Sequence, residues 1–152
     1  MEIRRAAKAD LPSITALAAG FRDHLGRSGP SDAQFAESIA RLLDSEDAEF
    51  CLAQEGQVPV GYVLLRYRHS MWAGGTEATL EDLFVDPGAR RAGAGRALVE
   101  AALGMARERS CASVCLDTNE NNAASTAIYA KLGFNAFSKR WNGRQVFYRL
   151  NF

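Results

Sequence analysis

The stretch that decides the fold is LEDLFVDPGARRAGAGRAL, Leu80–Leu98, in which an apolar strand is followed by a Pro-Gly turn, a glycine-rich loop and the start of a helix. Glycines at Gly93 and Gly95 let backbone N–H groups close around an anion, because no side chain blocks its approach. The helix start adds unpaired N–H donors and the positive end of the helix dipole. Three arginines add positive charge to the stretch: Arg90, Arg91 and Arg96. The stretch therefore predicts a phosphate-binding loop, with a simple helix cap as the competing interpretation of its glycines.

Two other kinds of phosphate loop fit less well. A Walker loop needs Gly-Lys-Ser/Thr where this chain has Gly93-Ala94-Gly95, and a dinucleotide fingerprint requires a third small residue where Leu98 stands. A pyrophosphate carries concentrated negative charge, so a nest of N–H groups at a helix start suits it better than a set of side chains.

The composition fits one globular domain spanning residues 1–152, because 47% of the residues are hydrophobic and can form a core. The 18 basic residues balance the 18 acidic ones, so a general nucleic-acid partner has no support. The N-terminal sequence MEIRRAAKAD lacks the apolar core of a signal peptide, and no run approaches the roughly 20 apolar residues of a membrane span. We therefore expect a cytoplasmic protein with no nucleic-acid or membrane partner.

The cysteines predict no metal site. Cys51, Cys111 and Cys115 leave one thiol without a pair, form no CxxC motif and have no histidine nearby in the sequence. We interpret them as reduced core thiols.

The order of strand and helix signals predicts an α/β fold. In the first half, the expected elements are a strand over Glu2–Ala6, a helix capped by Asp10, a helix opened by a Ser31–Gln34 capping box, and strands over Phe50–Gln54, Val58–Tyr67 and Thr79–Val85. The apolar faces of the two helices are expected to carry Ile14, Leu17, Ala18, Phe21 and Leu25, and then Phe35, Ile39, Leu42 and Leu43. The three consecutive strands should form an antiparallel meander.

The second half predicts a helix over Gly95–Arg109, a buried strand over Ser113–Asp117, and a helix over Asn122–Leu132 that Gly133 ends. Asn142-Gly143 is the strongest two-residue turn signal of the chain. The expected hairpin joins Phe134–Trp141 to Arg144–Leu150. Its exposed strands could pair between two subunits, so a homodimer is an open expectation.

Two separated motifs resemble those of the GNAT superfamily of N-acetyltransferases. The first is the Arg/Gln-x-x-Gly-x-Gly/Ala loop, present as Arg90-Arg91-Ala92-Gly93-Ala94-Gly95. The second is an Asn-x-x-Ala/Ser-x-x-x-Tyr-x-x-x-Gly-Phe pattern, present as Asn122, Ser125, Tyr129, Gly133 and Phe134. In order and at suitable spacing, they extend the resemblance over almost the whole chain. The LEDLFV context of Glu81 is similar, more weakly, to the diamine (polyamine) acetyltransferase branch.

The resemblance implies a single-domain fold with a central mixed, largely antiparallel sheet of about seven strands flanked by about four helices. It also implies acetyl-coenzyme A as donor, with its pyrophosphate on the amides of Arg91 to Arg96. Strands Thr79–Val85 and Ser113–Asp117 are expected to splay apart and admit the pantetheine arm. The coenzyme contacts it implies are Phe84, Val85, Arg90, Arg91, Ala92, Gly93, Ala94, Gly95, Arg96, Asn122 and Ser125. Asn122 also fits a helix N-cap, and both roles can hold at once.

For the chemistry, the resemblance implies that Tyr129 lies near the coenzyme sulfur, where a phenol can protonate the thiolate; a core aromatic is the competing interpretation. The acceptor ammonium must lose a proton, and Glu81 is our candidate base. Two alternatives for Glu81 stay open, a holder of a cationic substrate or an exposed carboxylate without a role. Asp82 is the reserve candidate, because it lies on the opposite strand face unless a bulge intervenes. We expect a backbone N–H near Phe84 or Val85 to meet the oxyanion.

The predicted function is an acetyl-coenzyme A-dependent N-acetyltransferase, with no metal, that acts on the primary amine of a polyamine- or amino-acid-like small molecule. The amine attacks directly, through a tetrahedral intermediate. Two alternatives are a protein lysine or N-terminal acetyltransferase and a non-catalytic acyl-coenzyme A-binding module.

Overall fold

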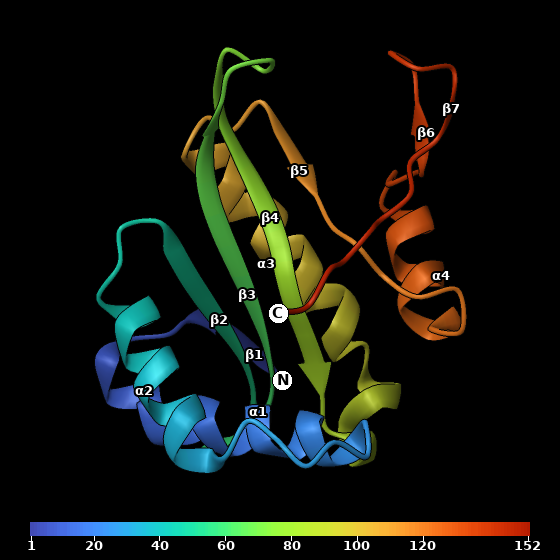
Figure 1. Ribbon diagram of the computed structural model, residues 1–152. Coiled ribbons are helices and arrows are strands. Elements are labelled where there is room, and N and C mark those ends of the chain that lie inside the picture. Colours follow the sequence, from blue (N-terminus) through green and yellow to red (C-terminus); the bar gives the residue numbers. More distant parts are fainter. The chain divides into compact units, whose positions relative to one another are not determined.

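The computed structural model describes residues 1–90 and 93–152, which form two compact units, Met1–Leu116 and Asp117–Phe152. The first unit contains β1 (Glu2–Arg5), η1 (Lys8–Asp10), α1 (Leu11–His24), α2 (Asp32–Leu43), β2 (Ala48–Glu55), β3 (Val58–Ser70), β4 (Gly75–Val85), η2 (Pro87–Ala92), α3 (Ala94–Glu108) and β5 (Ser113–Cys115) (Figure 1). The second contains α4 (Ala123–Lys131), β6 (Phe137–Ser138) and β7 (Gly143–Arg144). The predicted α/β class is confirmed.

The sheet of the first unit has the order β1-β2-β3-β4-β5. β1 to β4 pair antiparallel in sequence order, which confirms the predicted meander, and β5 joins β4 in parallel. β3 and β4 are longer than predicted and form a long hairpin that reaches beyond the helices (Figure 1).

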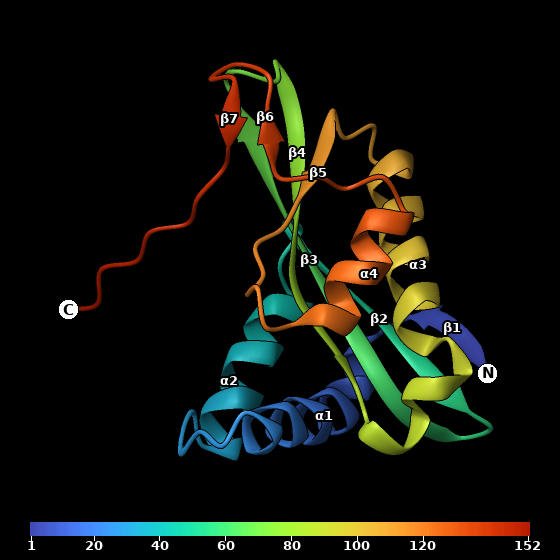
Figure 2. The ribbon, with the colours of Figure 1, turned by 90° about the vertical axis from the view of Figure 1, so that its right-hand side faces the viewer.

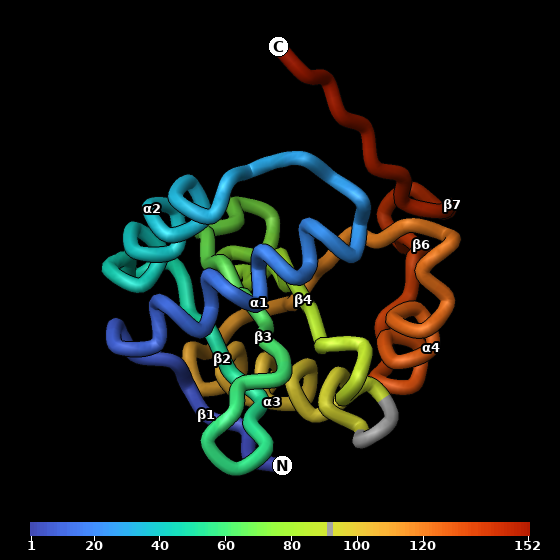
Figure 3. The backbone as a smooth tube through the Cα atoms, turned by 90° about the horizontal axis from the view of Figure 1, so that it is seen from below, coloured from blue at the N-terminus to red at the C-terminus, as the bar shows by residue number. Residues whose placement is uncertain are grey.

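Helices cover both faces of this sheet, with α1 and α2 on one face and α3 on the other (Figure 3). The core on the α1–α2 face joins both helices to β2, β3 and β4; its buried members are Ile14, Leu17, Ala18, Ile39, Ala48, Phe50, Leu52, Tyr62, Leu64 and Phe84. On the other face, α3 buries Ala94, Leu98, Val99, Ala102, Met105 and Ala106. Leu25, predicted to be buried, is 55% exposed because α1 ends one residue before it.

Of the two predicted helix caps, the capping box of α2 is present, whereas Asp10 does not cap α1 through its side chain. Ser31 and Gln34 form the expected capping box, in which each side chain bonds the other residue's backbone N–H. Asp10 stands at the N-cap of α1 without a capping hydrogen bond to that helix. Its carboxylate instead accepts from the Arg4 guanidinium and from the backbone N–H of Ala7. Asp10 therefore ties β1 to the start of α1.

In the second unit, α4 (Figure 2) ends as predicted. Gly133 follows it at φ +92°, a left-handed conformation that suits glycine. The hairpin is much shorter than predicted. Ser138 pairs with Gly143, so the loop runs from Lys139 to Asn142 and the expected two-residue turn is wrong. Gly143 is used as a strand residue, and β7 ends at Arg144 instead of reaching Leu150.

The predicted strand at Ser113–Asp117 is also shorter and more exposed than expected. β5 covers Ser113–Cys115 at the edge of the sheet, and its first and last residues are exposed. Cys115 is consequently an exposed free thiol, whereas Cys51 is buried as expected. Among the described residues, no helix combines the length and the apolar content that crossing a bilayer requires.

Candidate active site

The glycine-rich loop leads into Gly93, the N-cap residue of α3. Gly93 has φ +78°, and a Cβ added there would meet nothing within 4 Å, so the backbone at this residue is accessible to a ligand. The first backbone hydrogen bond of α3 runs from the N–H of Ala97 to the carbonyl oxygen of Gly93. The N–H groups of Ala94, Gly95 and Arg96 therefore have no acceptor within the helix. With the positive end of the helix dipole, these donors suit a phosphate.

The arginines of the loop have other partners in the described residues. The Arg90 Nε donates to the carbonyl oxygen of Val85 at 3.0 Å and so ties the loop to the end of β4. The Arg96 Nε donates to Glu100 at 2.8 Å, one helical turn along. Arg91 and Ala92, both predicted coenzyme contacts, lie outside the described residues.

A β-bulge interrupts β4 just before its C-terminal end. Leu64 of β3 faces Asp82, whereas the next residue of β3, Leu65, faces Leu80. Glu81 is therefore the extra residue of β4. A bulge disturbs the alternation of side chains, so adjacent residues can point to the same face of the sheet. The sequence predicts Asp82 on the strand face opposite Glu81 unless a bulge intervenes, and the bulge is present.

Both carboxylates meet residues on one face of β3. The Glu81 carboxylate lies 3.5 Å from the Arg66 guanidinium. Asp82 faces Leu64 in the strand register. Burial raises the pKa of Tyr62, and the negative charge of Asp82 raises it further. Tyr62 and Arg66 are separated by an even number of strand positions, so they share the face that α1 and α2 partly cover. Glu81 is half exposed on this face.

The register also fixes the direction of the backbone groups at the end of β4. The Asp86 N–H donates to the carbonyl oxygen of Val60 at 2.8 Å. Because hydrogen-bonded and non-hydrogen-bonded pairs alternate along an antiparallel ladder, Phe84 bonds β3, and Leu83 and Val85 direct their N–H groups away from it. On that side, the pairing of β4 with β5 ends at Thr79. The end of β4 thus offers backbone donors where β5 has left the sheet.

Leu83 is the residue that sequence reasoning missed. Its side chain carries no functional group, and only the strand register shows that its N–H points the same way as that of Val85. The sequence offered one signal: Leu83 lies two residues before Val85 on the predicted strand, and residues at this spacing have the same orientation.

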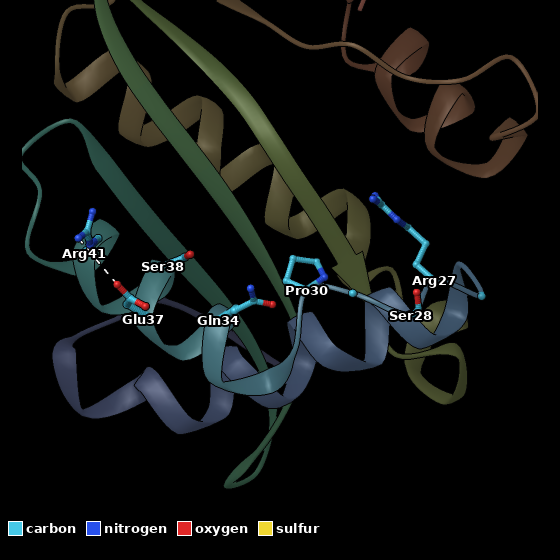
Figure 4. Close-up of a pocket in the computed structure, with 9 residues that line it drawn as sticks. Arg27, Ser28, Pro30, Gln34, Glu37, Ser38 and Arg41 are labelled. Atoms are coloured by element: carbon cyan, nitrogen blue, oxygen red, sulfur yellow. Dashed lines mark ion pairs between the residues drawn. The ribbon is translucent and has the colours of Figure 1, made fainter. Parts of the chain in front are cut away.

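A pocket of about 880 Å³ opens beside α2 and the segment that precedes it (Figure 4). Its lining is polar and includes both signs of charge: Gly26, Arg27, Ser28, Gly29, Pro30, Gln34, Glu37, Ser38 and Arg41. The pocket begins two residues beyond α1, whose last turns face the end of β4: the ring of Phe21 stacks on Phe84 with centroids 5.2 Å apart, and His24 lies 6.5 Å from it. The lining suits a small polar molecule.

In the second unit, Tyr129 is buried on α4 and packs edge-on against Phe134, with ring centroids 5.9 Å apart. Burial raises the pKa of Tyr129, and a side-chain hydrogen bond with Ser125 opposes that rise. Asn122 occupies the N-cap position of α4 but makes no capping hydrogen bond; its amide nitrogen lies 3.5 Å from the Thr118 hydroxyl. Tyr129 is thus a neutral phenol at physiological pH.

Coenzyme A fits the donors that surround this loop. Its pyrophosphate requires a small, open set of hydrogen-bond donors, which the bare Gly93 and the first amides of α3 provide. Its pantetheine arm carries amides that can pair with the outward-facing backbone groups of Leu83 and Val85. No group of three or more His, Cys, Asp or Glu in the described residues is arranged to hold a metal ion.

Comparison with known proteins gives consistent results. The model of the Acetyltransferase (GNAT) family matches residues 16–134. The [ribosomal protein bS18]-alanine N-acetyltransferase of Escherichia coli (strain K12) is 42% identical over 66 residues, which are 43% of this chain and 45% of that protein. The match thus spans less than half the length of that relative.

Solved structures resemble the chain over its full length. A crystal structure from Arthrobacter sp. FB24 has 27% sequence identity and a TM-score of 0.86, covering 100% of this chain and 96% of the other. A structure of AAC(6')-Iy in complex with the bisubstrate analog CoA-S-monomethyl-acetylneamine has 25% identity and a TM-score of 0.77, covering 99% and 97%.

Proposed function

The chain belongs to the acetyltransferase (GNAT) family, and from this premise we propose that it transfers the acetyl group of acetyl-coenzyme A to a primary amine of a small cationic molecule. One observation carries the proposal. Within five residues, β4 presents two carboxylates on the partly covered face of the sheet and then two N–H groups directed away from β3. The first pair suits an ammonium acceptor, and the second suits a thioester.

The loop holds the coenzyme. We assign its pyrophosphate to the N–H groups of Ala94, Gly95 and Arg96, with Gly93 leaving the approach open. Bound there, acetyl-coenzyme A supplies an activated acetyl group. Arg90 has a positioning role, because its bond to the Val85 carbonyl oxygen holds the loop against the end of β4.

The end of β4 stabilises the developing negative charge. The N–H groups of Leu83 and Val85 are fixed donors that need no reorganisation when a carbonyl oxygen becomes an oxyanion. Phe84 uses its N–H within the β3–β4 ladder, so we assign it a packing role against α1 through its ring.

The carboxylates prepare the acceptor. An amine that arrives as ammonium must lose a proton before it attacks, and we assign that proton to Glu81, directly or through water. Asp82, on the same face, holds the positive charge of the acceptor. The polar pocket beside α2 receives the rest of the molecule.

Tyr129 is the proton donor to the departing thiolate. Its raised pKa keeps the phenol protonated at neutral pH, so the proton is available when the C–S bond breaks. Ser125 and Asn122 stand on the same helix start and remain proposed coenzyme contacts.

An N-terminal peptide acetyltransferase is the second candidate. The pocket beside α2 is open to the surface, so it can also receive the end of a polypeptide. The relative from Escherichia coli, an alanine N-acetyltransferase of a ribosomal protein, supports this reading.

Free-thiol release from acetyl-coenzyme A tests the proposal against polyamines, amino acids, an aminoglycoside and two peptides, one with a free N-terminal alanine and one with a lysine. We expect turnover on a cationic small molecule, with saturation by the coenzyme. Turnover on the alanine peptide alone would select the second candidate. Coenzyme binding by calorimetry without thiol release on any acceptor would refute catalysis in favour of a binding module.

A further inference from the structure

The segment between α1 and α2, residues 25–31, is held in place by Arg22 of α1. The Arg22 guanidinium donates to the carbonyl oxygen of Pro30 at 2.9 Å and to the Asp32 carboxylate at 2.6 Å. It also donates to Asp23 at 2.8 Å, and its side chain is mostly buried. One arginine therefore fixes the path of the segment and engages the carboxylates on either side of it. Neither of these carboxylates lines the pocket beside α2.

The lining of that pocket is rich in hydrogen-bond donors. Glu37 is the one carboxylate among its lining residues, and it already pairs with Arg41 at 3.8 Å. The amide oxygen of Gln34 accepts from the backbone N–H of Ser31, which leaves the amide nitrogen of Gln34 as a donor. Two serine hydroxyls in the lining can donate as well. The pocket therefore suits an anionic group better than a second cation.

Arg27 is the cation of the pocket that lacks a partner. Within the part of the chain that the structure describes, its guanidinium takes part in no ion pair and no hydrogen bond. Arg27 stands at the opposite end of the pocket from the Glu37–Arg41 ion pair (Figure 4). A guanidinium offers parallel N–H donors whose spacing matches the two oxygens of a carboxylate. The Arg27 end of the pocket is thus the place where an anion is best bound.

The Arg27 end is also the end that adjoins the proposed reaction site. Arg27 follows His24 by three residues, and the His24 ring lies 6.5 Å from the ring of Phe84. Phe84 in turn follows Glu81 by three residues of β4, which is roughly 10 Å along a strand. An acceptor whose ammonium lies at Glu81 therefore reaches toward Arg27 when several carbon atoms separate its two ends.

We propose that the acceptor carries a carboxylate at the end remote from its reacting ammonium, and that Arg27 binds this carboxylate. The inference rests on the proposed function, because it takes the reacting amine to lie at Glu81. A basic amino acid such as ornithine or lysine has this form, and its two ammonium groups and one carboxylate leave it net cationic. Its side-chain nitrogen forms the new amide bond as the C–S bond of the donor breaks. Glu81 takes the ammonium proton, and the coenzyme thiolate receives a proton from Tyr129.

Lysine and lysinamide form a matched pair for the test, because the amide replaces only the carboxylate. In thiol release from acetyl-coenzyme A, kcat/KM for lysine should exceed that for lysinamide by about 10-fold or more, mainly through KM. Arg27→Gln should bring this ratio to about 1, and Arg27→Lys, which keeps the charge, should retain part of it. A merely structural role of Arg27 would lower both values and leave the ratio unchanged. Arg107→Gln, at an exposed arginine of α3 on the other face of the sheet, is the control and should keep the wild-type ratio.

Equal kcat/KM for lysine and lysinamide, or acetylation of the α-nitrogen as detected by mass spectrometry, would overturn the inference and leave acetyl transfer itself intact. Calorimetric binding of ε-acetyl-lysine and of its amide gives a readout that needs no turnover. The acid should bind more tightly than the amide, and Arg27→Gln should remove this preference. Equal binding of the two, or binding of neither, would overturn the inference. A preference in calorimetry without thiol release on any acceptor would refute the proposed catalysis and retain the carboxylate site at Arg27.

Discussion

A Cβ placed on Gly61 would lie 2.8 Å from the carbonyl oxygen of Phe84. The same Cβ would lie 3.1 Å from the Val85 side chain and 3.3 Å from Leu98 of α3. β3, β4 and α3 therefore lie in close contact where the proposed thioester site begins. Only glycine permits this approach, because the nearest atom belongs to the backbone and cannot move aside as a side chain can.

We predict that Gly61→Ala destabilises the protein by about 1–3 kcal/mol, the typical cost of overpacking, and lowers kcat for thiol release. The end of β4 must move away, and the N–H groups of Leu83 and Val85 move with it. Thermal unfolding and steady-state kinetics measure the two effects. Gly104→Ala is the matched control: it lies inside α3 with nothing within 4 Å of a new Cβ, so it should stabilise by up to about 1 kcal/mol. Equal stability of the two variants would contradict the close approach.

Gly93→Glu should abolish coenzyme binding, because its carboxylate would stand where the pyrophosphate is proposed to lie. The left-handed backbone at Gly93 adds a strain of about 1–2 kcal/mol for any other residue. Gly74→Glu controls for that strain, since Gly74 has φ +65° and equally open surroundings at the opposite end of β4. Calorimetry should find normal coenzyme affinity for Gly74→Glu and none for Gly93→Glu; equal affinities would refute the loop assignment.

The carboxylates can be separated by their kinetics. Glu81→Gln should lower kcat by at least about 100-fold and remove the acidic limb of the pH–rate profile, because the proton acceptor is lost. Asp82→Asn should mainly raise KM for a cationic acceptor, by about 10-fold for one charge-assisted contact. Glu55→Gln, an exposed carboxylate at the end of β2, is the control. A pH–rate profile that Glu81→Gln leaves unchanged would remove Glu81 as the base.

The elements that depend on local patterns could be predicted from the sequence, and those that depend on register could not. Ser31 and Gln34 specify a helix cap within four residues, and the glycine-rich loop indicates where α3 begins. The bulge at Glu81 has no such local signature, because it arises from the pairing of two strands. The direction of the Leu83 N–H follows from the same pairing, which explains why it escaped prediction.

The prediction of the C-terminal hairpin failed for a different reason. The predicted strand over Arg144–Leu150 is wrong beyond Arg144, because a turn signal does not say how far the partner strands continue to supply hydrogen bonds. β7 ends at Arg144, and residues 145–152 belong to no helix or strand. The Asn142-Gly143 signal was likewise outweighed, since Gly143 joins the strand and the loop begins at Lys139.

Asp10 makes stability depend on pH in the acid range. The Arg4 guanidinium, opposed by partial burial, holds the pKa of Asp10 at about 2, below its ordinary value of 3.8. A carboxyl group with a lowered pKa stabilises the folded state above its unfolded pKa, and this contribution is lost as the pH falls from about 4 through about 2. Asp10→Asn should therefore cost about 1–2 kcal/mol at pH 7 and almost nothing near pH 2. Urea unfolding at the two pH values measures both changes in the free energy of unfolding. Asp23→Asn is the control: it removes a more exposed ion pair and should have little effect at either pH.

Tyr129→Phe should lower kcat by about 100-fold or more while leaving coenzyme affinity unchanged, because it removes the proposed proton donor and keeps the buried ring. The raised pKa of Tyr129 means that wild-type activity should not fall as the pH rises through 9, where a phenol of ordinary pKa begins to ionise. Tyr148→Phe, which removes an exposed hydroxyl near the C-terminal end of the sequence, is the control. A core aromatic without chemistry would behave differently: Tyr129→Phe would then change the unfolding temperature and leave kcat near that of the wild type.

An acyl donor whose leaving thiol has a low pKa offers the decisive comparison, because a better leaving group needs less protonation. With such a donor the deficit of Tyr129→Phe should shrink, whereas a deficit of constant size would exclude proton transfer to sulfur as the role of Tyr129.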